Sequence, residues 1–335
     1  MAPPPLMRTR ARGRRTPPVA SDCKTISCTR PILLYTAVTM KIDTHVHTVC
    51  SDGRKTAAEV CELAAGLGIR LLSVTDHDTL DAYPAAFEAA ARWQIRLVPG
   101  VELSTKDEDG HKEVHVLGLK IDAADGHLRR ELRKLAGARI DARRRLLDNV
   151  NAYLGKKHAG WADVRFEEVR RRVPGNIVGK PHLAMALVES GRKAGIYLSE
   201  EELFELFRAP GIATKKAYEL TMEECIALIR RAGGEPVLAH PCEYRRPDEV
   251  MKKFAGLGGG ATELCKYRYK MKMPAIKALD PLDRVGAERQ MNALTLRLGG
   301  KYGFRLTASS DYHGKVGEPG METDDYGIDV GWLLG

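Results

Sequence analysis

The sequence lacks any long uninterrupted apolar segment, and its cysteines lack any paired arrangement. Charge or glycine breaks every apolar run well short of the roughly 18 consecutive apolar residues that a membrane-spanning helix requires, so we expect no membrane crossing. The seven cysteines form no Cys-x-x-Cys pair and no regular framework. Their odd number in a long chain predicts reduced thiols and a cytoplasmic protein.

Length and charge narrow the class of protein further. A chain of 335 residues allows two domains or one barrel with an insertion, and 44% hydrophobic with 29% charged residues is typical of a globular protein with a sizeable core. The net charge is +9, but residues 1–39 contain seven basic residues and one acidic residue, which leaves +3 for the remainder. Bulk charge therefore does not predict a broad surface for duplex nucleic acid.

The first 39 residues differ in composition from the rest of the chain. They contain six of the seventeen prolines and no periodic apolar pattern, which predicts a disordered basic extension. No apolar core of a secretory signal follows Arg14 and Arg15, although a targeting role is an alternative. We expect the folded part to begin at Met40, with residues 1–39 as an upstream extension.

Short β-rich runs alternate with helical patterns from Lys41 onward, as is typical of parallel βαβ units. Two helices begin with capping boxes, one at Thr56 with Glu59 and one at Thr221 with Glu224. The expected strands are Lys41–His45, Arg70–Thr75, Ile95–Glu102, Glu113–Ile121, Pro236–His240, Thr262–Cys265 and Phe304–Ala308.

Strand signals disappear between Asp125 and about Leu220, where charged helical segments replace them. This block predicts a helical insertion over 125–220 between two parts of a barrel, 40–124 and 221–335. The helices expected in it are Leu128–Leu147, Phe166–Arg172, Pro181–Glu189 and Glu200–Phe207.

Histidine and carboxylate side chains recur at the ends of the expected strands. His45 and His47 end the first strand, and alternate residues of a strand point the same way, so both imidazoles can reach one ion. Buried carboxylates and imidazoles at this density are costly without cations, and nitrogen and oxygen ligands suit Mn, Zn or Fe. The further members of this predicted metal site are Asp52, His77, Glu102, His115, His240, Asp311 and His313.

Seven strings in this order resemble the PHP (polymerase and histidinol phosphatase) family of metal-dependent phosphoesterases. The resemblance covers about residues 41–335 and implies an α/β fold, a distorted (β/α)7 TIM-like barrel with a helical insertion. It is greatest to the branch that removes phosphate from nucleoside 3′,5′-bisphosphates and trims short RNA from its 5′ end. The strings are IDTHVHTVCSDG (42–53), TDHDT (75–79), PGVELS (99–104), EVHVLG (113–118), KPHLA (180–184), AHP (239–241) and SSDYHG (309–314).

The resemblance implies two to three divalent metal ions and makes the residue at each of nine positions a metal ligand. The first ion would be held by His45, His47, Glu102 and Asp311. Glu102 would bridge to a second ion held by His115 and His240, and Asp52, His77 and His313 would hold the third. Glu102, Asp311 and His313 would be catalytic. Three divalent ions would outweigh the three carboxylates by a local charge of about +3, which favours a phosphate substrate.

Other residues have two interpretations. Lys180 and His182 lie where the family usually has Arg and His that reach the substrate phosphate, but a lysine at a helix start can also be merely solvated. Arg143–Arg145 and Arg170–Arg172 are either guides for an RNA tail or exposed helix charges. Ser104 and Asp78 are candidates for orienting metal ligands.

The sequence thus predicts a phosphoric monoester hydrolase that acts on small nucleotides, with short single-stranded RNA as a further substrate and no obligate protein partner. Histidinol-phosphate phosphatase is the alternative that shares the metal ligands. An amidohydrolase also begins with His-x-His, although the TDHD and SDYH strings argue against it. A non-catalytic PHP module that stabilises a polymerase or binds nucleic acid is the rival outside enzymes, and retention of all nine ligand-type residues argues against it.

Overall fold

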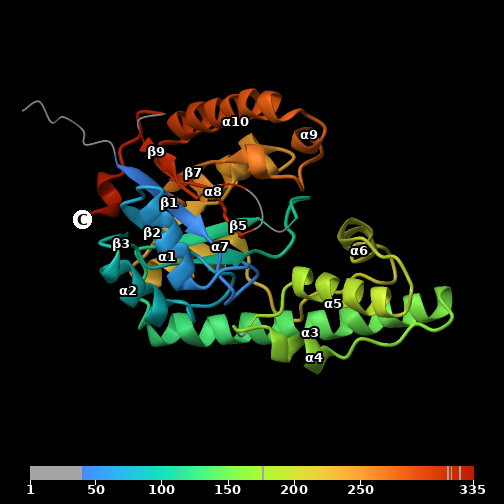
Figure 1. Cartoon of the computed structure of the whole chain (residues 1–335). Helices are drawn as coiled ribbons and strands as arrows, with labels where there is room; N and C mark the ends of the chain where they lie inside the picture. Colours follow the sequence, from blue (N-terminus) through green and yellow to red (C-terminus); the bar gives the residue numbers. More distant parts are fainter. Residues whose placement is uncertain (1–39, 113, 176, 315–316, 318, 324–325) are drawn as a thin grey trace, which may run out of the picture. The chain divides into compact units, whose positions relative to one another are not determined.

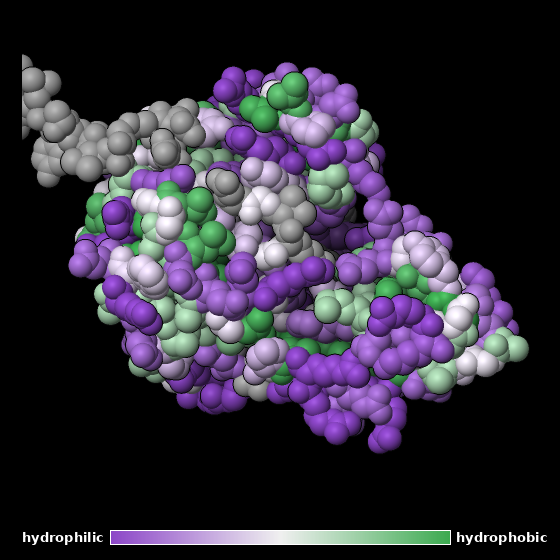
Figure 2. All heavy atoms as spheres, in the orientation of Figure 1, coloured by the Kyte–Doolittle hydropathy of each residue, from purple (hydrophilic) through white to green (hydrophobic). Residues whose placement is uncertain are grey.

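A computed structural model describes residues 40–335, except 113, 176, 315–316, 318 and 324–325. The predicted basic extension, residues 1–39, lies outside the described residues. Among the helices in the described part, none has both the length and the apolar character needed to cross a membrane. The face drawn in Figure 2 is mostly hydrophilic, with hydrophobic side chains in small separate groups.

The described strands form two sheets, ordered β3-β2-β1-β9 and β4-β5-β6-β7-β8 (Figure 1). Within the sheets β1, β2 and β3 run parallel, as do β6, β7 and β8. The strands are β1 (Lys41–Val46), β2 (Leu71–Val74), β3 (Arg96–Leu97), β4 (Gly100–Ser104), β5 (His115–Leu119), β6 (Glu235–Leu238), β7 (Ala261–Cys265), β8 (Arg305–Ser309) and β9 (Met321–Glu322).

Isolated bridges connect the two sheets at the ends of their strands. Val46 at the end of β1 pairs with Tyr312 beyond β8, and His77 beyond β2 pairs with Glu102 of β4, both in parallel. The fold is therefore α/β, but the hydrogen-bonded strands form two sheets instead of one closed ladder. Closure into the expected (β/α)7 barrel stays a prediction.

The prediction of parallel βαβ units from Lys41 onward is wrong for β5. This strand runs antiparallel to both of its neighbours, with Glu102 of β4 opposite Leu117 and Val116 opposite Leu238 of β6. The reason is the short connection from β4 to β5, which shows no helix in its described residues 105–112 and 114, whereas a parallel return needs a crossover of a dozen or more residues. The reversal places the start of β5, His115, at the edge where the parallel strands end.

The expected strand Ile95–Glu102 is two strands, β3 and β4, separated at Val98 and Pro99. Proline has no backbone N–H for a ladder and breaks the run. The next residue must be small, because a Cβ on Gly100 would lie 2.5 Å from Ser73 Oγ. This close approach brings β4, which carries Glu102, against β2.

Helices α1, α2, α7 and α8 pack on the strands through one large apolar core. Both predicted capping boxes are present, at Thr56 with Glu59 before α1 and at Thr221 with Glu224 before α7. The helices are α1 (Ala57–Gly66), α2 (Tyr83–Arg92), α3 (Gly126–Lys157), α4 (Phe166–Arg172), α5 (Lys180–Lys193), α6 (Glu200–Leu206), α7 (Met222–Arg231), α8 (Pro247–Gly256), α9 (Pro274–Lys277) and α10 (Pro281–Tyr302).

Helices α3 to α6 occupy the segment predicted as an insertion, and they have an apolar core of their own. Leu147 and Val150 of α3, Phe166 of α4, Leu183 of α5 and Leu203 of α6 are buried in it. Helix α3 extends ten residues past its expected end at Leu147. The limits of the insertion as a domain, 125–220, remain a prediction.

A buried ion pair joins the first half of α3 to the strands. Arg139 Nε donates to Asp78 Oδ2 at 2.9 Å, and Arg139 Nη2 donates to Ser104 Oγ at 3.2 Å. The side chains of Arg139 and Asp78 are 9% and 2% exposed. Because Asp78 follows β2 and Ser104 ends β4, this contact fixes α3 against the ends of two strands.

Replacement of Arg139 by Met should lower the free energy of unfolding by about 3 to 5 kcal/mol, because it leaves the Asp78 carboxylate buried without its cation. The double variant D78N/R139M should recover part of that loss, as measured by denaturant unfolding. The matched control is R144M on the same helix, whose exposed pair with Glu167 should contribute little. Equal stability of R139M and R144M would contradict the anchoring role.

Candidate metal centre

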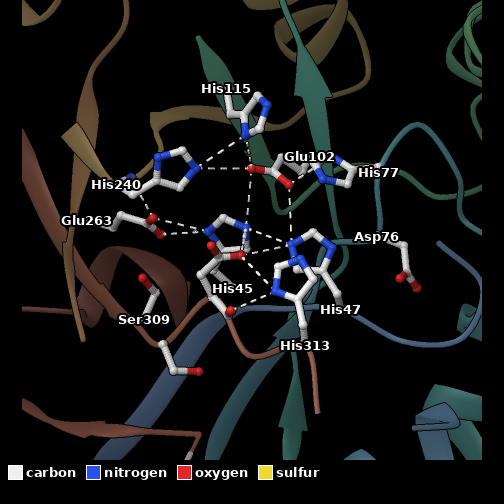
Figure 3. Close-up of polar contacts among 12 residues, drawn as sticks. His45, His47, Asp76, His77, Glu102, His115, His240, Glu263, Ser309 and His313 are labelled. Carbon is white, nitrogen blue, oxygen red and sulfur yellow. Dashed lines mark hydrogen bonds and ion pairs between the residues drawn. The ribbon is translucent and has the colours of Figure 1, made fainter. Parts of the chain in front are cut away.

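Two buried histidines at the end of the first strand direct ring nitrogens toward each other. His45 lies in β1 and His47 directly follows it, and both side chains are fully buried. Their Nε2 atoms are 3.0 Å apart, so the two rings converge on one point as the His-x-His spacing predicts (Figure 3).

Glu102 occupies the centre of the cluster (Figure 3). It projects from β4, is 1% exposed, and places ring nitrogens of five histidines around its two oxygens. Oε2 is 2.9 Å from His77 Nδ1 and 3.3 Å from His47 Nε2. Oε1 is 2.8 Å from His115 Nδ1 and 3.4 Å from the Nε2 atoms of His45 and His240.

All nine predicted ligand residues lie in this one region, in overlapping groups with their ligand atoms close together. Asp311 Oδ1 is 3.1 Å from His47 Nε2 and 3.2 Å from His45 Nε2. Asp52 Oδ1 is 3.4 Å from His313 Nε2. The groups whose ligand atoms lie within 4.8 Å of one another are His45, His47 and Glu102; Glu102, His115 and His240; His47, Asp52, His77 and His313; and His240, Glu243 and Asp311.

Several buried atoms of this cluster lack hydrogen bonds within the described part of the chain and fit a set of divalent ions. Both oxygens of Glu102 and Nδ1 of His77 are buried, yet none of the three makes a hydrogen bond of acceptable geometry to a described residue. Buried polar atoms are rarely left in this state. An ion about 2.0 to 2.2 Å from imidazole and carboxylate ligands holds them roughly 3.3 Å apart, close to the separations around Glu102. The donor set, nitrogen and oxygen without thiolate, suits Mn, Zn or Fe.

Protonation must compete with metal binding at His47. Burial opposes the charged ring, but the carboxylates of Asp311 and Glu102 raise the pKa of His47 to about 10. Burial lowers the pKa of His77 to about 4, against the pull of Glu102, so this ring is already in the neutral form that binds metals. Metal binding must therefore release a proton from His47, and it should weaken as the pH falls.

Glu263 of β7 is a part of the site that sequence reasoning missed. Its two oxygens lie 3.1 and 3.2 Å from His45 Nδ1, and Oε1 also accepts from the backbone N–H of His240 at 2.7 Å. The carboxylate thus directs His45 Nε2 inward. An acidic residue inside the apolar run Thr262–Cys265 was the available signal.

Two further buried carboxylates hold the loops that carry ligands. Asp76 accepts from the backbone N–H of Thr48 at 2.8 Å and from its hydroxyl at 2.6 Å. Asp43 accepts from the backbone N–H groups of Ser310 at 3.0 Å and Gly320 at 2.7 Å. These bonds hold Thr48 after β1, and Ser310 and Gly320 after β8, without any bound ion.

Comparison with known proteins gives the same assignment as the motifs. Residues 43–234 match the PHP domain family. The chain belongs to this family.

Its PHP relatives include two curated enzymes. The chain is 35% identical over 234 residues to the 5′-3′ exoribonuclease Rnm of Salmonella typhimurium, covering 67% of this chain and 74% of the relative. It is 27% identical over 291 residues to a 3′,5′-nucleoside bisphosphate phosphatase of Chromobacterium violaceum, covering 85% and 92%. The predicted resemblance to this branch is confirmed.

A solved structure from Chromobacterium violaceum, described as an amidohydrolase with bound sulfate and no metal, matches the fold. Its TM-score is 0.65 at 26% sequence identity, and the match covers 84% of this chain and 90% of that one. The two folds are therefore similar over most of both chains.

Lys180 and His182 lie at the start of α5, beside the PHP ligand cluster. Gly179 is the N-cap, and a Cβ on it would be 3.0 Å from Cβ of Asp52. His182 Nδ1 accepts from the Gly179 N–H at 3.0 Å, so the ring carries its proton on Nε2. The first turn of α5 thus packs against the turn that carries Asp52.

The remaining candidates make contacts within the protein. Ser104 and Asp78 both bond to Arg139, and so serve the attachment of α3. The arginine runs are also engaged: Arg144 pairs with Glu167, Arg172 pairs with Glu189, and Arg170 Nη1 donates to the carbonyl of Gly175 at 2.9 Å. These contacts favour a structural interpretation of both runs.

Purified protein loaded with Mn²⁺ should bind more than one ion per chain, and its melting temperature should rise with loading. E102Q should lose most of this binding, because a neutral amide cannot neutralise two neighbouring ions. Elemental analysis and calorimetric titration measure the ion count of both proteins, and thermal unfolding measures the melting temperature. The matched control, E59Q, changes an exposed capping glutamate of α1 and should keep the wild-type count. A folded wild type that binds no ion would contradict the assignment.

Proposed function

We propose that this PHP protein is a metal-dependent phosphoesterase that hydrolyses phosphate from small nucleotides. The proposed substrates are a nucleoside 3′,5′-bisphosphate or a nucleoside monophosphate, with trimming of short RNA from its 5′ end as a further activity. The proposed ligands are the nine residues of the three expected groups: His45, His47, Asp52, His77, Glu102, His115, His240, Asp311 and His313.

The observation that carries this proposal is the position of Glu102. One buried carboxylate lies within 3.4 Å of ring nitrogens from five histidines, with its two oxygens directed to different subsets of them. A carboxylate in this position can bridge two ions. Closely spaced divalent ions activate water for attack on phosphorus and stabilise the leaving oxygen, so no serine or cysteine nucleophile is needed.

The chain's own residues orient this chemistry. Glu263 holds His45 through Nδ1, and Asp43 and Asp76 hold the loops after β8 and β1. Both His240 and Asp311 have positive φ angles, 29° and 52°, a strained backbone that concentrates at functional sites. The ligand atoms are thus held in place by packing and hydrogen bonds, which is what a multinuclear centre requires.

The nucleotide substrate is inferred from the relatives and from α5. One relative is named for a nucleoside bisphosphate and another for RNA. A bisphosphate carries a second phosphate that does not react, and Lys180 at the N-terminus of α5 offers it a cation and the positive end of the helix dipole beside the ligand cluster. Histidinol phosphate has only the phosphate that is cleaved.

The rival functions predict different results in one screen. Mn-loaded protein should be assayed on nucleoside 3′,5′-bisphosphate, nucleoside monophosphate, histidinol phosphate and 5′-phosphorylated oligonucleotides. Our proposal predicts the highest kcat/KM on the bisphosphate or monophosphate. Preference for histidinol phosphate would instead identify the protein as a histidinol-phosphate phosphatase. No turnover of any of the four substrates would favour a non-catalytic module.

K180A should lower kcat/KM for the bisphosphate by roughly ten- to hundredfold, because one charge-assisted contact to the second phosphate is lost. Hydrolysis of an aryl phosphate, which lacks this group, should change far less. K193A at the other end of α5, where Lys193 pairs with Glu189, is the matched control and should behave as wild type. Equal losses on both substrates would instead assign Lys180 to the reacting phosphate.

A further inference from the structure

Lys270 contacts two members of the fourth group of candidate ligands, Glu243 and Asp311. His240, Glu243 and Asp311 could hold an ion by position, but no metal of the expected trinuclear set is assigned to this group. Lys270 Nζ is 2.7 Å from Glu243 Oε1 and donates to Asp311 Oδ2. The Lys270 side chain is 6% exposed, and those of its two partners are 11% and 5% exposed.

Lys270 is held in this position by the backbone around it. It follows the short helix Tyr267–Tyr269, and its N–H donates to the carbonyl of Tyr267 at 2.9 Å. Tyr267 is fully buried, and its hydroxyl accepts from the N–H of Cys242 at 3.0 Å. Because Cys242 adjoins Glu243, this bond fixes the carboxylate and the ammonium relative to each other.

The two oxygens of Asp311 face different cations. Oδ1 is directed at His45 and His47, where the first proposed ion would bind, and Oδ2 is taken by Lys270. An ion held by Asp311 Oδ2 and Glu243 Oε1 beside His240 would have to lie about 2 Å from the two oxygens that Lys270 Nζ contacts. The ammonium and a divalent ion therefore exclude each other.

We propose that the ammonium of Lys270 takes the place of a metal ion in this fourth group. It thereby limits the number of metal ions that the protein binds and leaves Asp311 as a ligand for the His45–His47–Glu102 group. This inference rests on the proposed function, since it presumes the metal centre. Lys270 is a positioning residue, because it acts through Asp311 and Glu243 on the ions. Loss of its charge should create an additional divalent site.

The test compares Mn²⁺ stoichiometry by calorimetric titration and elemental analysis. K270M and K270Q should each bind one more ion per chain than the wild type, because Asp311 Oδ2 and Glu243 Oε1 then lose the ammonium that they contact beside His240 Nδ1. K272M is the matched control, since Lys272 pairs with the same Glu243 at 2.9 Å but is 53% exposed and should leave the count unchanged. K270M/E243Q should return to the wild-type count.

Thermal unfolding gives a second readout. Without metal, K270M should melt below the wild type, and Mn²⁺ should raise its melting temperature by more than it raises that of the wild type. K270Q retains a hydrogen-bond donor, so it carries the same stoichiometry test if K270M does not fold. Equal ion counts in wild type and both Lys270 variants would overturn the inference, whereas a wild type that binds no ion would contradict the proposed function.

Discussion

The carboxylate of Glu102 is buried among imidazoles from β1, β5 and the segments after β1, β2 and β6, and the surrounding structure is arranged around that charge. An isolated carboxylate in such a place would be expensive, and imidazoles alone compensate it only if they hold protons. Divalent ions satisfy both kinds of group at once. The cluster therefore calls for cations, held between side chains that the fold brings together from distant parts of the chain.

A second set of charged side chains holds the ligand residues of this cluster in position. Glu263 on β7 and the Lys270–Glu243 pair contact the ligand residues, while Arg139 on α3 ties the helical block to Asp78 near the same edge. Each of these contacts is buried, so its geometry is restricted and loss of one partner is costly. The position of α5 beside Asp52 follows from this attachment and from the close approach at Gly179.

Local signals in the sequence predicted much of this structure. Capping boxes such as Thr56 with Glu59 located helix starts, because their hydrogen bonds span only three residues. The His-x-His spacing predicted convergent rings because it depends only on strand alternation. The direction of β5 was mispredicted, since strand periodicity carries no information on pairing. Glu263 and Lys270 were missed because their partners lie far away along the chain.

The most direct test of the central claim is anomalous diffraction from crystals of the Mn-loaded protein, recorded near the Mn absorption edge. The account predicts peaks in the three groups formed by the nine ligand residues, with two of the peaks sharing Glu102 as a common ligand. Ordered, Mn-soaked crystals with no peak within coordinating distance of Glu102 would contradict it.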